Sequence, residues 1–363
     1  MRRKRCGIIF VILLTSVFAC QCFAIETSAA SAILVEQKSG RVFYEKAADE
    51  EMLIASITKI MTAVVALENG ELGMTYTVTG EDMAEGSSMY LKPGEVLSLE
   101  ELLYGLMLSS GNDAALAVAH CVSGDVRDFV ASMNETAAKL GMTHSSFANP
   151  NGLDQEGHYS TARDMALLTS YALNNEHFRR IVSTESVTIG DRYLKNHNKL
   201  LALCEGCIGI KTGYTKAAGR TLVSAAERQG MTFICVTLND GDDWNDHQRL
   251  YDDVFSRYHL ESPVKAGCVM ASTEVIGGTQ ARVNLVPAAD FTFPVKDGEK
   301  LTVKVDVPIS ISAPLEVGET VGTVTIYLDG SKIGAVPLVV SSNVEAECSD
   351  DDSGFLKRLF CWK

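Results

Sequence analysis

The stretch "ASITKIMT", Ala55 to Thr62, places a lysine one turn after a serine where a helix is predicted to begin. Apolar residues then recur at helical spacing: Ile57, Ile60, Met61, Val64 and Val65. Asn69-Gly70 is a helix-terminating pair, so the spacing predicts a single helix with one buried stripe. Because residues three positions apart share a helical face, Ser56 and Lys59 are predicted to lie side by side.

A serine and a lysine on one face are suited to nucleophilic catalysis under one condition. The hydroxyl of Ser56 is a weak nucleophile until a base removes its proton. Lys59 acts as that base only when it is neutral, and burial or a second nearby cation would lower its pKa. Backbone N–H groups at the helix start would favour negative charge developing near Ser56. Taken alone, however, an SxxK pattern most often marks a surface serine and lysine.

Two further motifs strengthen the catalytic interpretation. "SGN", Ser110 to Asn112, falls in a break between two predicted helices, and "KTG", Lys211 to Gly213, falls on a predicted strand. Lys211 is a candidate for the second cation and for binding a substrate carboxylate, while Gly213 would let a ligand approach the strand edge. Read separately, Ser110 and Asn112 would simply cap the following helix. Lys211 would then be a solvated strand lysine. The joint occurrence of the three motifs favours catalysis.

The surrounding patterns predict a mixed domain of helices and antiparallel strands. "AILVEQKSGRVFYEK", 32–46, alternates and turns at Ser39-Gly40, which predicts a β-hairpin. Ser98 and Glu101 have capping-box spacing for a helix that runs to about Leu108. Further helices are predicted from residue 113, over 126–140 and over 161–173. "IGIKTGYT", "RTLVSAA" and "MTFICVTLND" predict three successive antiparallel strands.

The length and the texture of the chain predict more than one domain. The 363 residues are too many for one ordinary core. From about 261 to 345 the sequence is almost all strand and turn, as in "LTVKVDVPISIS", so a second, smaller all-β domain is expected. The predicted division is a signal peptide at 1–24, a catalytic domain at 25–260, the β-rich domain at 261–346 and a tail at 347–363.

The two ends of the chain carry targeting and anchoring patterns. "MRRKR", an apolar run and "CFA" are typical of a secretory signal peptide cleaved after Ala24. The alternatives are an uncleaved membrane anchor and, more weakly, a lipoprotein at Cys20. In the tail, "SDDDSGFLKRLFCWK", apolar residues can share one helical face, so peripheral contact with a membrane is one hypothesis and a frayed terminus is the other.

Charge and cysteine content exclude some classes of partner. Removing the signal, with its four positive side chains, takes the formal net charge from −14 to −18, which argues against a nucleic-acid partner. "CEGC", Cys204 to Cys207, is a single CxxC, and no HExxH occurs. This is weak evidence for zinc, so we expect a local disulfide or two thiols, with no metal and no cofactor.

SxxK, SxN and KTG in this order form a set that occurs in β-lactamases and penicillin-binding proteins. The chain resembles the low-molecular-mass penicillin-binding proteins, which are serine-type D-alanyl-D-alanine carboxypeptidases. "PNGLDQEGHYSTARDMA", "NHNKLL" and "GIKTGYTKAAGRTLVSAA" also resemble this family, as does a β-rich domain followed by an amphipathic tail. The resemblance spans essentially the whole mature chain. It implies an α+β domain of the β-lactamase/transpeptidase type, with a mainly antiparallel sheet flanked by helices.

The resemblance implies an acyl-enzyme mechanism. Ser56 would attack the carbonyl between two terminal D-alanines of a peptidoglycan stem pentapeptide, and Lys59 would take its proton. Ser110 would pass a proton to the leaving amine, and water would then release the shortened peptide. β-Lactam antibiotics would acylate Ser56 because their strained amide resembles the substrate. The protein would act outside the cytoplasm, attached to the outer face of a bacterial cytoplasmic membrane.

The resemblance also implies a set of binding residues. Asn112 would hold the substrate amide, and Lys211 and Thr212 would bind the terminal carboxylate. The backbone N–H groups of Ser56 and Tyr214 would form the oxyanion hole.

One departure concerns the carboxylate. Some relatives place an arginine after the KTG sheet, where this chain has Asp243, and Arg249 is out of register. Carboxylate recognition would then rest on the KTG motif alone. His158, Asn198 and Arg220 are interpreted as structural residues.

Several alternatives share this fold. A β-lactamase of class A would need an ExxLN pattern, and the loop after SGN has Glu156 without that pattern. The β-rich domain is also unexpected in a β-lactamase. A D,D-endopeptidase or a transpeptidase would use the same acyl-enzyme, and a catalytically silent wall-binding protein would lack the reaction. The physiological stage at which the protein acts is left open by the sequence.

Overall fold

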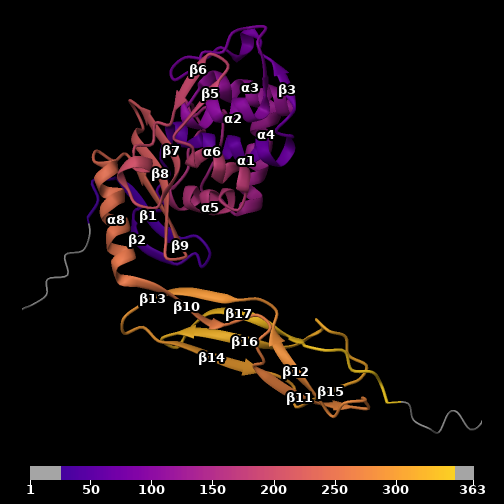
Figure 1. Cartoon of the computed structure of the whole chain (residues 1–363). Coiled ribbons are helices and arrows are strands. Elements are labelled where there is room, and N and C mark those ends of the chain that lie inside the picture. The colour runs from indigo at the N-terminus through magenta and orange to yellow at the C-terminus, as the bar shows by residue number, and fades with distance from the viewer. Residues whose placement is uncertain (1–25, 348–363) are drawn as a thin grey trace, which may run out of the picture.

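The computed structural model describes residues 26–347 and contains an α+β domain followed by a β-rich domain (Figure 1). The first domain is built on a five-stranded sheet in which every neighbouring pair is antiparallel. The strand order is β2-β1-β9-β8-β7, with β1 (Ser31–Glu36), β2 (Val42–Lys46), β7 (Cys207–Thr215), β8 (Gly219–Arg228) and β9 (Met231–Leu238). The hairpin and the three successive strands are therefore confirmed.

Helices cover both faces of this sheet. On one face, α1 (Lys59–Asn69), α5 (Ala162–Ala172) and α6 (Glu176–Ser183) contact the sheet. The same core continues through α2 (Leu99–Leu108), α3 (Asn112–Ser123) and α4 (Val126–Leu140), which pack on these helices. The other face packs on α8 (Asp243–Arg257). Successive strand residues supply opposite faces, because Ile33 joins the larger helical core whereas Leu34 joins the core beneath α8.

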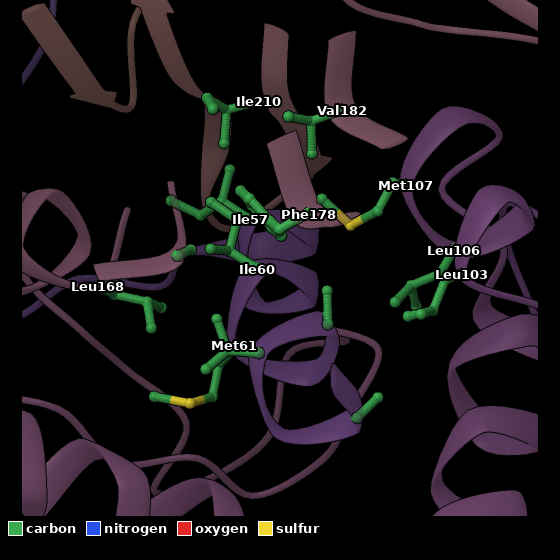
Figure 2. Close-up of a cluster of buried hydrophobic side chains, with 14 of the residues drawn as sticks. Ile57, Ile60, Met61, Leu103, Leu106, Met107, Leu168, Phe178, Val182 and Ile210 are labelled. Atoms are coloured by element: carbon green, nitrogen blue, oxygen red, sulfur yellow. The ribbon is translucent and has the colours of Figure 1, made fainter. Parts of the chain in front are cut away.

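The helix α1 is the centre of the larger core. Figure 2 shows apolar side chains from neighbouring elements around its Ile60 and Met61 and around Ile57 of the preceding 3-10 helix. The partners come from α2, α5, α6 and β7: Leu103, Leu106, Met107, Leu168, Phe178, Val182 and Ile210. The stripe expected from the sequence is buried, so the start of α1 is fixed against both the sheet and the other helices.

Local signals set the helix ends as predicted. Ser98 and Glu101 form a reciprocal capping box at the start of α2. Gly141 closes α4 with φ of 78°, a left-handed conformation that glycine adopts at little cost. Shorter elements complete the domain: a 3-10 helix at Ala55–Thr58, another at Gly80–Asp82, β3 (Thr75–Thr77), β4 (Val96–Ser98), β5 (Ser186–Ile189), β6 (Arg192–Lys195) and α7 (Leu200–Leu203).

The second domain is all strand and turn in the described residues. Its six-stranded sheet has the order β14-β16-β17-β12-β11-β15, and β10 pairs with β13 alongside it. The strands are β10 (Tyr258–Val264), β11 (Ala271–Ile276), β12 (Arg282–Pro287), β13 (Phe291–Lys296), β14 (Leu301–Asp306), β15 (Ser310–Ser312), β16 (Thr320–Leu328) and β17 (Ser331–Val340). All pairs are antiparallel except β11 with β15. The predicted fold class is confirmed.

One arginine connects the two domains. Arg41, in the turn of the β1–β2 hairpin, forms an ion pair with Glu299 and donates to the carbonyl oxygen of Pro294. Its guanidinium also lies over the rings of Tyr258 and Phe293, about 5 Å away.

The predicted signal peptide and the amphipathic tail lie outside residues 26–347. Among the helices within those residues, none has the length and apolar character needed to cross a membrane.

Candidate active site

Lys59 is the centre of the candidate site, and its nitrogen contacts three segments of the chain. The side chain is fully buried at the first residue of α1. Its Nζ lies 3.0 Å from Ser56 Oγ, 2.7 Å from Asn112 Oδ1 and 2.5 Å from the carbonyl oxygen of Asn151. The start of α1, the SGN turn and the loop that contains Asn151 therefore meet at one nitrogen atom.

The surroundings of Lys59 favour its neutral form. Burial holds the pKa of Lys59 well below its usual range, and the charge of Lys211 lowers it further, while Asp113 opposes them. A neutral amine has two N–H groups and one lone pair. The two carbonyl oxygens of Asn112 and Asn151 accept the N–H groups, and the Ser56 hydroxyl can donate to the lone pair. The contacts thus match a lysine that can accept a proton from Ser56.

The SGN turn lies between α2 and α3. Helix α3 starts at Asn112 without a side-chain cap, so the alternative in which Ser110 and Asn112 merely cap this helix is wrong. Ser110 lines the pocket described below. Asn112 donates through Nδ2 to the carbonyl oxygen of Glu85 at 2.6 Å while its Oδ1 receives Lys59. Both ends of this amide are occupied in this structure, so Asn112 contacts Lys59 and Glu85 here. Its binding of the substrate amide, which the family resemblance implies, stays a prediction.

The KTG motif lies on β7, the edge strand of the sheet. Lys211 is fully buried, donates to the carbonyl oxygen of Thr212 at 2.9 Å, and has its pKa lowered to about 7 by burial. Thr212, Gly213 and Tyr214 line the pocket. A Cβ at Gly213 would lie 2.9 Å from the backbone nitrogen of Ser56. The glycine therefore lets β7 approach the 3-10 helix at Ala55–Thr58, which is called the serine turn below.

Backbone strain accompanies each of the three motifs. Ala55, directly before the serine, has φ of 49°, and Ser110 has φ of 57°. Ile210, directly before Lys211, has φ of 123°, which is unusual for a β-branched residue. Such conformations cost about 1–3 kcal/mol each and persist only where the surrounding structure enforces them. The packing around the site holds the three motifs in conformations that the local sequence alone would not adopt.

A pocket of about 440 Å³ opens at Ser56. Its lining includes four of the predicted residues beyond Ser56, namely Ser110, Thr212, Gly213 and Tyr214. The rest of the lining is Ser87, His197, Arg220, Asp243 and Trp244. Lys59, Asn112 and Lys211 are buried behind this surface.

Sequence reasoning missed part of this lining. His197 lies within "NHNKLL", which the sequence identifies only as family-like, and Ser87 and Trp244 carry no motif. The sequence favours a structural role for Arg220. Arg220 pairs with Asp243, which is a structural contact, and it also lines the pocket, a position that the sequence did not indicate.

His158 and Asn198 have structural contacts. The backbone N–H of Ala148 donates to His158 Nδ1, which makes Nε2 the protonated nitrogen, 2.7 Å from Thr58 Oγ1. Thr58 in turn donates to the carbonyl oxygen of Ala55. His158 therefore braces the serine turn from behind. Asn198 Oδ1 accepts the backbone N–H of Leu200 at the start of α7.

The cysteines do not form a metal centre in the described residues. Cys204 and Cys207 are two thiols rather than a disulfide in this structure. Within residues 26–347, no group of three histidine, cysteine or carboxylate side chains is arranged to hold a metal ion.

Comparison with known proteins identifies families for both domains. Residues 18–242 match the family described as D-alanyl-D-alanine carboxypeptidase, and residues 258–346 match the family described as penicillin-binding protein 5, C-terminal domain. The D-alanyl-D-alanine carboxypeptidase DacF of Bacillus subtilis is 33% identical, over 87% of this chain and 86% of the relative. The D-alanyl-D-alanine carboxypeptidase DacC of Escherichia coli is 34% identical, over 90% of this chain and 86% of the relative.

Solved structures are similar over both domains. Penicillin-binding protein 5 from Haemophilus influenzae is 26% identical and superposes with a TM-score of 0.77, over 88% of this chain and 98% of that structure. The sequence match and the structural match both extend through the β-rich domain. The family resemblance predicted from the sequence is therefore confirmed, and the chain belongs to the D-alanyl-D-alanine carboxypeptidase family.

Proposed function

We propose that this protein is a serine-type D-Ala-D-Ala carboxypeptidase that removes the terminal D-alanine from peptidoglycan stem pentapeptides. The observation that carries the proposal is the buried Lys59, whose Nζ lies 3.0 Å from Ser56 Oγ at the base of an open pocket. A lysine kept neutral within hydrogen-bond distance of a serine hydroxyl is the arrangement that nucleophilic acyl transfer requires.

Acylation begins with transfer of the Ser56 proton to Lys59. The Ser56 Oγ forms a bond to the carbonyl carbon between the two D-alanines, and the developing oxyanion is held by the backbone N–H groups of Ser56 and Tyr214. The close approach of Gly213 to the Ser56 nitrogen supports this assignment, because it brings the two backbone segments together. The C–N bond then breaks, and the leaving amine of D-alanine takes up a proton through Ser110.

Deacylation repeats the chemistry with water as the nucleophile. Lys59 accepts a proton from water as the water oxygen attacks the ester carbon, and Ser56 recovers its hydroxyl proton when the ester bond breaks. The product is a stem peptide shortened by one D-alanine. A β-lactam would follow the same first step, forming an ester with Ser56, and its ring-opened amine would stay attached and delay hydrolysis.

The location of the protein is also a proposal. The substrate lies outside the bacterial cytoplasm, and the N-terminal sequence has the pattern of a secretory signal, which together support an extracytoplasmic enzyme. Peripheral attachment to the membrane through the tail is supported only by the amphipathic pattern of "GFLKRLFCWK".

Intact-mass spectrometry tests the central step. The mature protein is incubated with benzylpenicillin alongside Ser56→Ala. We expect one penicillin adduct on the wild type, none on the variant, and slow loss of the adduct. Rapid turnover of the drug would instead indicate a β-lactamase, and no adduct with no turnover would leave a silent wall-binding protein.

Product analysis separates the peptidase alternatives. Incubation with a stem pentapeptide should release free D-alanine and a tetrapeptide. Cross-linked dimers formed from added acceptor peptide would indicate a transpeptidase. Cleavage of an existing cross-link, with no release of D-alanine from the pentapeptide, would indicate a D,D-endopeptidase.

A further inference from the structure

The pocket contains a charged pair that the acyl-transfer residues do not use. Arg220 on β8 and Asp243 at the first position of α8 both line the pocket. Arg220 Nη2 donates to Asp243 Oδ1 at 2.6 Å, and Arg220 Nε lies 3.1 Å from Asp243 Oδ2. The Asp243 side chain is only 4% exposed, whereas the Arg220 side chain is 43% exposed. The carboxylate is thus an anchor, and the guanidinium is the group presented to the pocket.

The hydrogen bonds of Arg220 leave one edge of its guanidinium open. The Nε and Nη2 side of the fork holds Asp243. Within residues 26–347, Nη1 makes no hydrogen bond to another side chain or to the backbone. A guanidinium has five N–H groups, so the Nη1 and Nη2 edge can still bind a second carboxylate through two parallel hydrogen bonds.

Neighbouring residues hold this edge in place beside the KTG strand. Arg220 is the direct partner of Tyr214 in the β7–β8 ladder, so their side chains lie on the same face of the sheet. The Trp244 ring lies 5.6 Å from the guanidinium carbon and restricts its motion on a second side. Asp243 Oδ1 also accepts the backbone N–H of Trp244, which fixes the carboxylate and, through it, the arginine.

Charge complementarity identifies what this edge would bind. Among the described residues that line the pocket, Arg220 carries the only permanent positive charge. Lys211 is buried, with its Nζ on the carbonyl oxygen of Thr212. A substrate that ends in a free carboxylate therefore meets Arg220 as the exposed cation in the pocket that also contains the reactive serine.

We propose that Arg220, oriented by Asp243 and Trp244, is the specificity-determining residue that recognises the free C-terminal carboxylate of the substrate. The proposal rests on the carboxypeptidase function proposed above. It also accounts for the aspartate at position 243, where the family resemblance favours an arginine. Arg220 on β8 supplies the positive charge, and Asp243 fixes the position of its guanidinium.

Paired substrates test this assignment. The first substrate is a diacylated tripeptide that ends in D-Ala-D-Ala with a free carboxylate, and the second is its C-terminal amide. Arg220→Gln should lower kcat/KM for the carboxylate peptide about tenfold to hundredfold, mainly through KM, because charged hydrogen bonds are lost. The amide peptide should change less than about threefold, since it forms no such ion pair.

Two further variants control the experiment. Arg249→Gln removes an arginine of α8 that pairs with Asp246 and does not line the pocket, so both substrates should react as with the wild type. Arg220→Lys keeps the charge next to Asp243 but cannot offer two parallel N–H groups, so a severalfold loss on the carboxylate peptide is expected. Acylation by benzylpenicillin methyl ester, which has no carboxylate, checks that each variant retains a competent Ser56.

The outcomes separate this proposal from the proposed function. A wild type that releases D-alanine but does not prefer the carboxylate peptide over the amide would overturn the role of Arg220 and leave the carboxypeptidase assignment intact. If Arg220→Gln prefers the carboxylate peptide over the amide as strongly as the wild type does, the role of Arg220 is likewise overturned. If Arg220→Gln fails to fold, the same comparison is made with Arg220→Lys. A wild type that is neither acylated nor active on either peptide would instead remove the proposed function.

Discussion

Replacing Gly213 by alanine should slow acylation and lower the stability of the domain. A Cβ at this position would lie 2.4 Å from Thr221 Oγ1, 2.9 Å from the Ser56 nitrogen and 3.2 Å from Ala55 Cβ. Thr221 is held by its hydrogen bond to the carbonyl oxygen of Ile54, and Ser56 by the start of α1, so neither can move freely. The strand and the serine turn must separate by several tenths of an ångström.

The magnitude follows from these contacts. Overpacking one methyl group in a tight site costs about 1–3 kcal/mol, which for a domain of this size lowers Tm by about 2–4 °C per kcal/mol. The displacement falls on the two backbone segments proposed to form the oxyanion hole. Because misplacement of about 1 Å can cost about 100-fold in rate, we expect acylation to slow about 10- to 100-fold.

Two measurements on the same samples check this prediction. The rate of benzylpenicillin acylation is followed by intact-mass spectrometry, and Tm by calorimetry. Gly73→Ala is the matched control, because a Cβ at Gly73 meets no atom within 4 Å and should change neither quantity. A Gly213→Ala protein that acylates at the wild-type rate would refute the reasoning, since it would mean that the contact between β7 and the serine turn does not set the reactive geometry.

Three further predictions concern pH and the contact between the domains. Because burial lowers the pKa of Lys211 to about 7, its charge is lost as the pH rises through that value and no longer adds to the positive field of Arg220, so kcat/KM for a carboxylate peptide should fall on the alkaline side. A flat pH–rate profile from about pH 6 to about pH 9 would contradict this. Burial lowers the pKa of His158 from 6.5 to about 4, so the unfolded chain binds a proton that the folded chain does not. The free energy of unfolding should therefore fall by about 3 kcal/mol as the pH drops through this window. Urea unfolding at several pH values measures the slope, and His158→Gln should reduce it. Finally, Arg41→Ala should destabilise the contact between the domains by about 1–3 kcal/mol, seen as a lower or divided calorimetric transition. Arg127→Ala, which breaks an ion pair whose arginine is 91% exposed, should have no such effect.

Many residues of the site could be identified from sequence motifs. The hydrogen bonds that these residues form could not. SxxK, SGN and KTG gave Ser56, Ser110 and Thr212, all of which line the pocket. The same motifs did not reveal that Asn112 would be engaged at both ends of its amide. That engagement depends on the carbonyl oxygen of Glu85, which no pattern in the sequence associates with the SGN turn.

The sequence could not place Arg220 at the pocket, for a physical reason. In the sequence this residue is one polar position at the start of a strand, and a solvated strand arginine has the same signature. Its position at the pocket depends on the register that places it opposite Tyr214 and on the packing of α8 against β8. Neither the register nor the helix position can be obtained from the residues near 220.

The sequence by itself determined the elements and the three motifs, because their signals are local. Capping at Ser98, the left-handed glycine at Gly141 and the apolar stripe after Ser56 depend on residues within about one or two turns. Only the tertiary structure decided which groups meet, since Lys59 and Asn112 are 53 residues apart and Arg220 and Asp243 are 23 apart. The lowered pKa of Lys59 and the anchored position of Arg220 result from burial and long-range contacts, and those exist only once the sheet and the helices have packed.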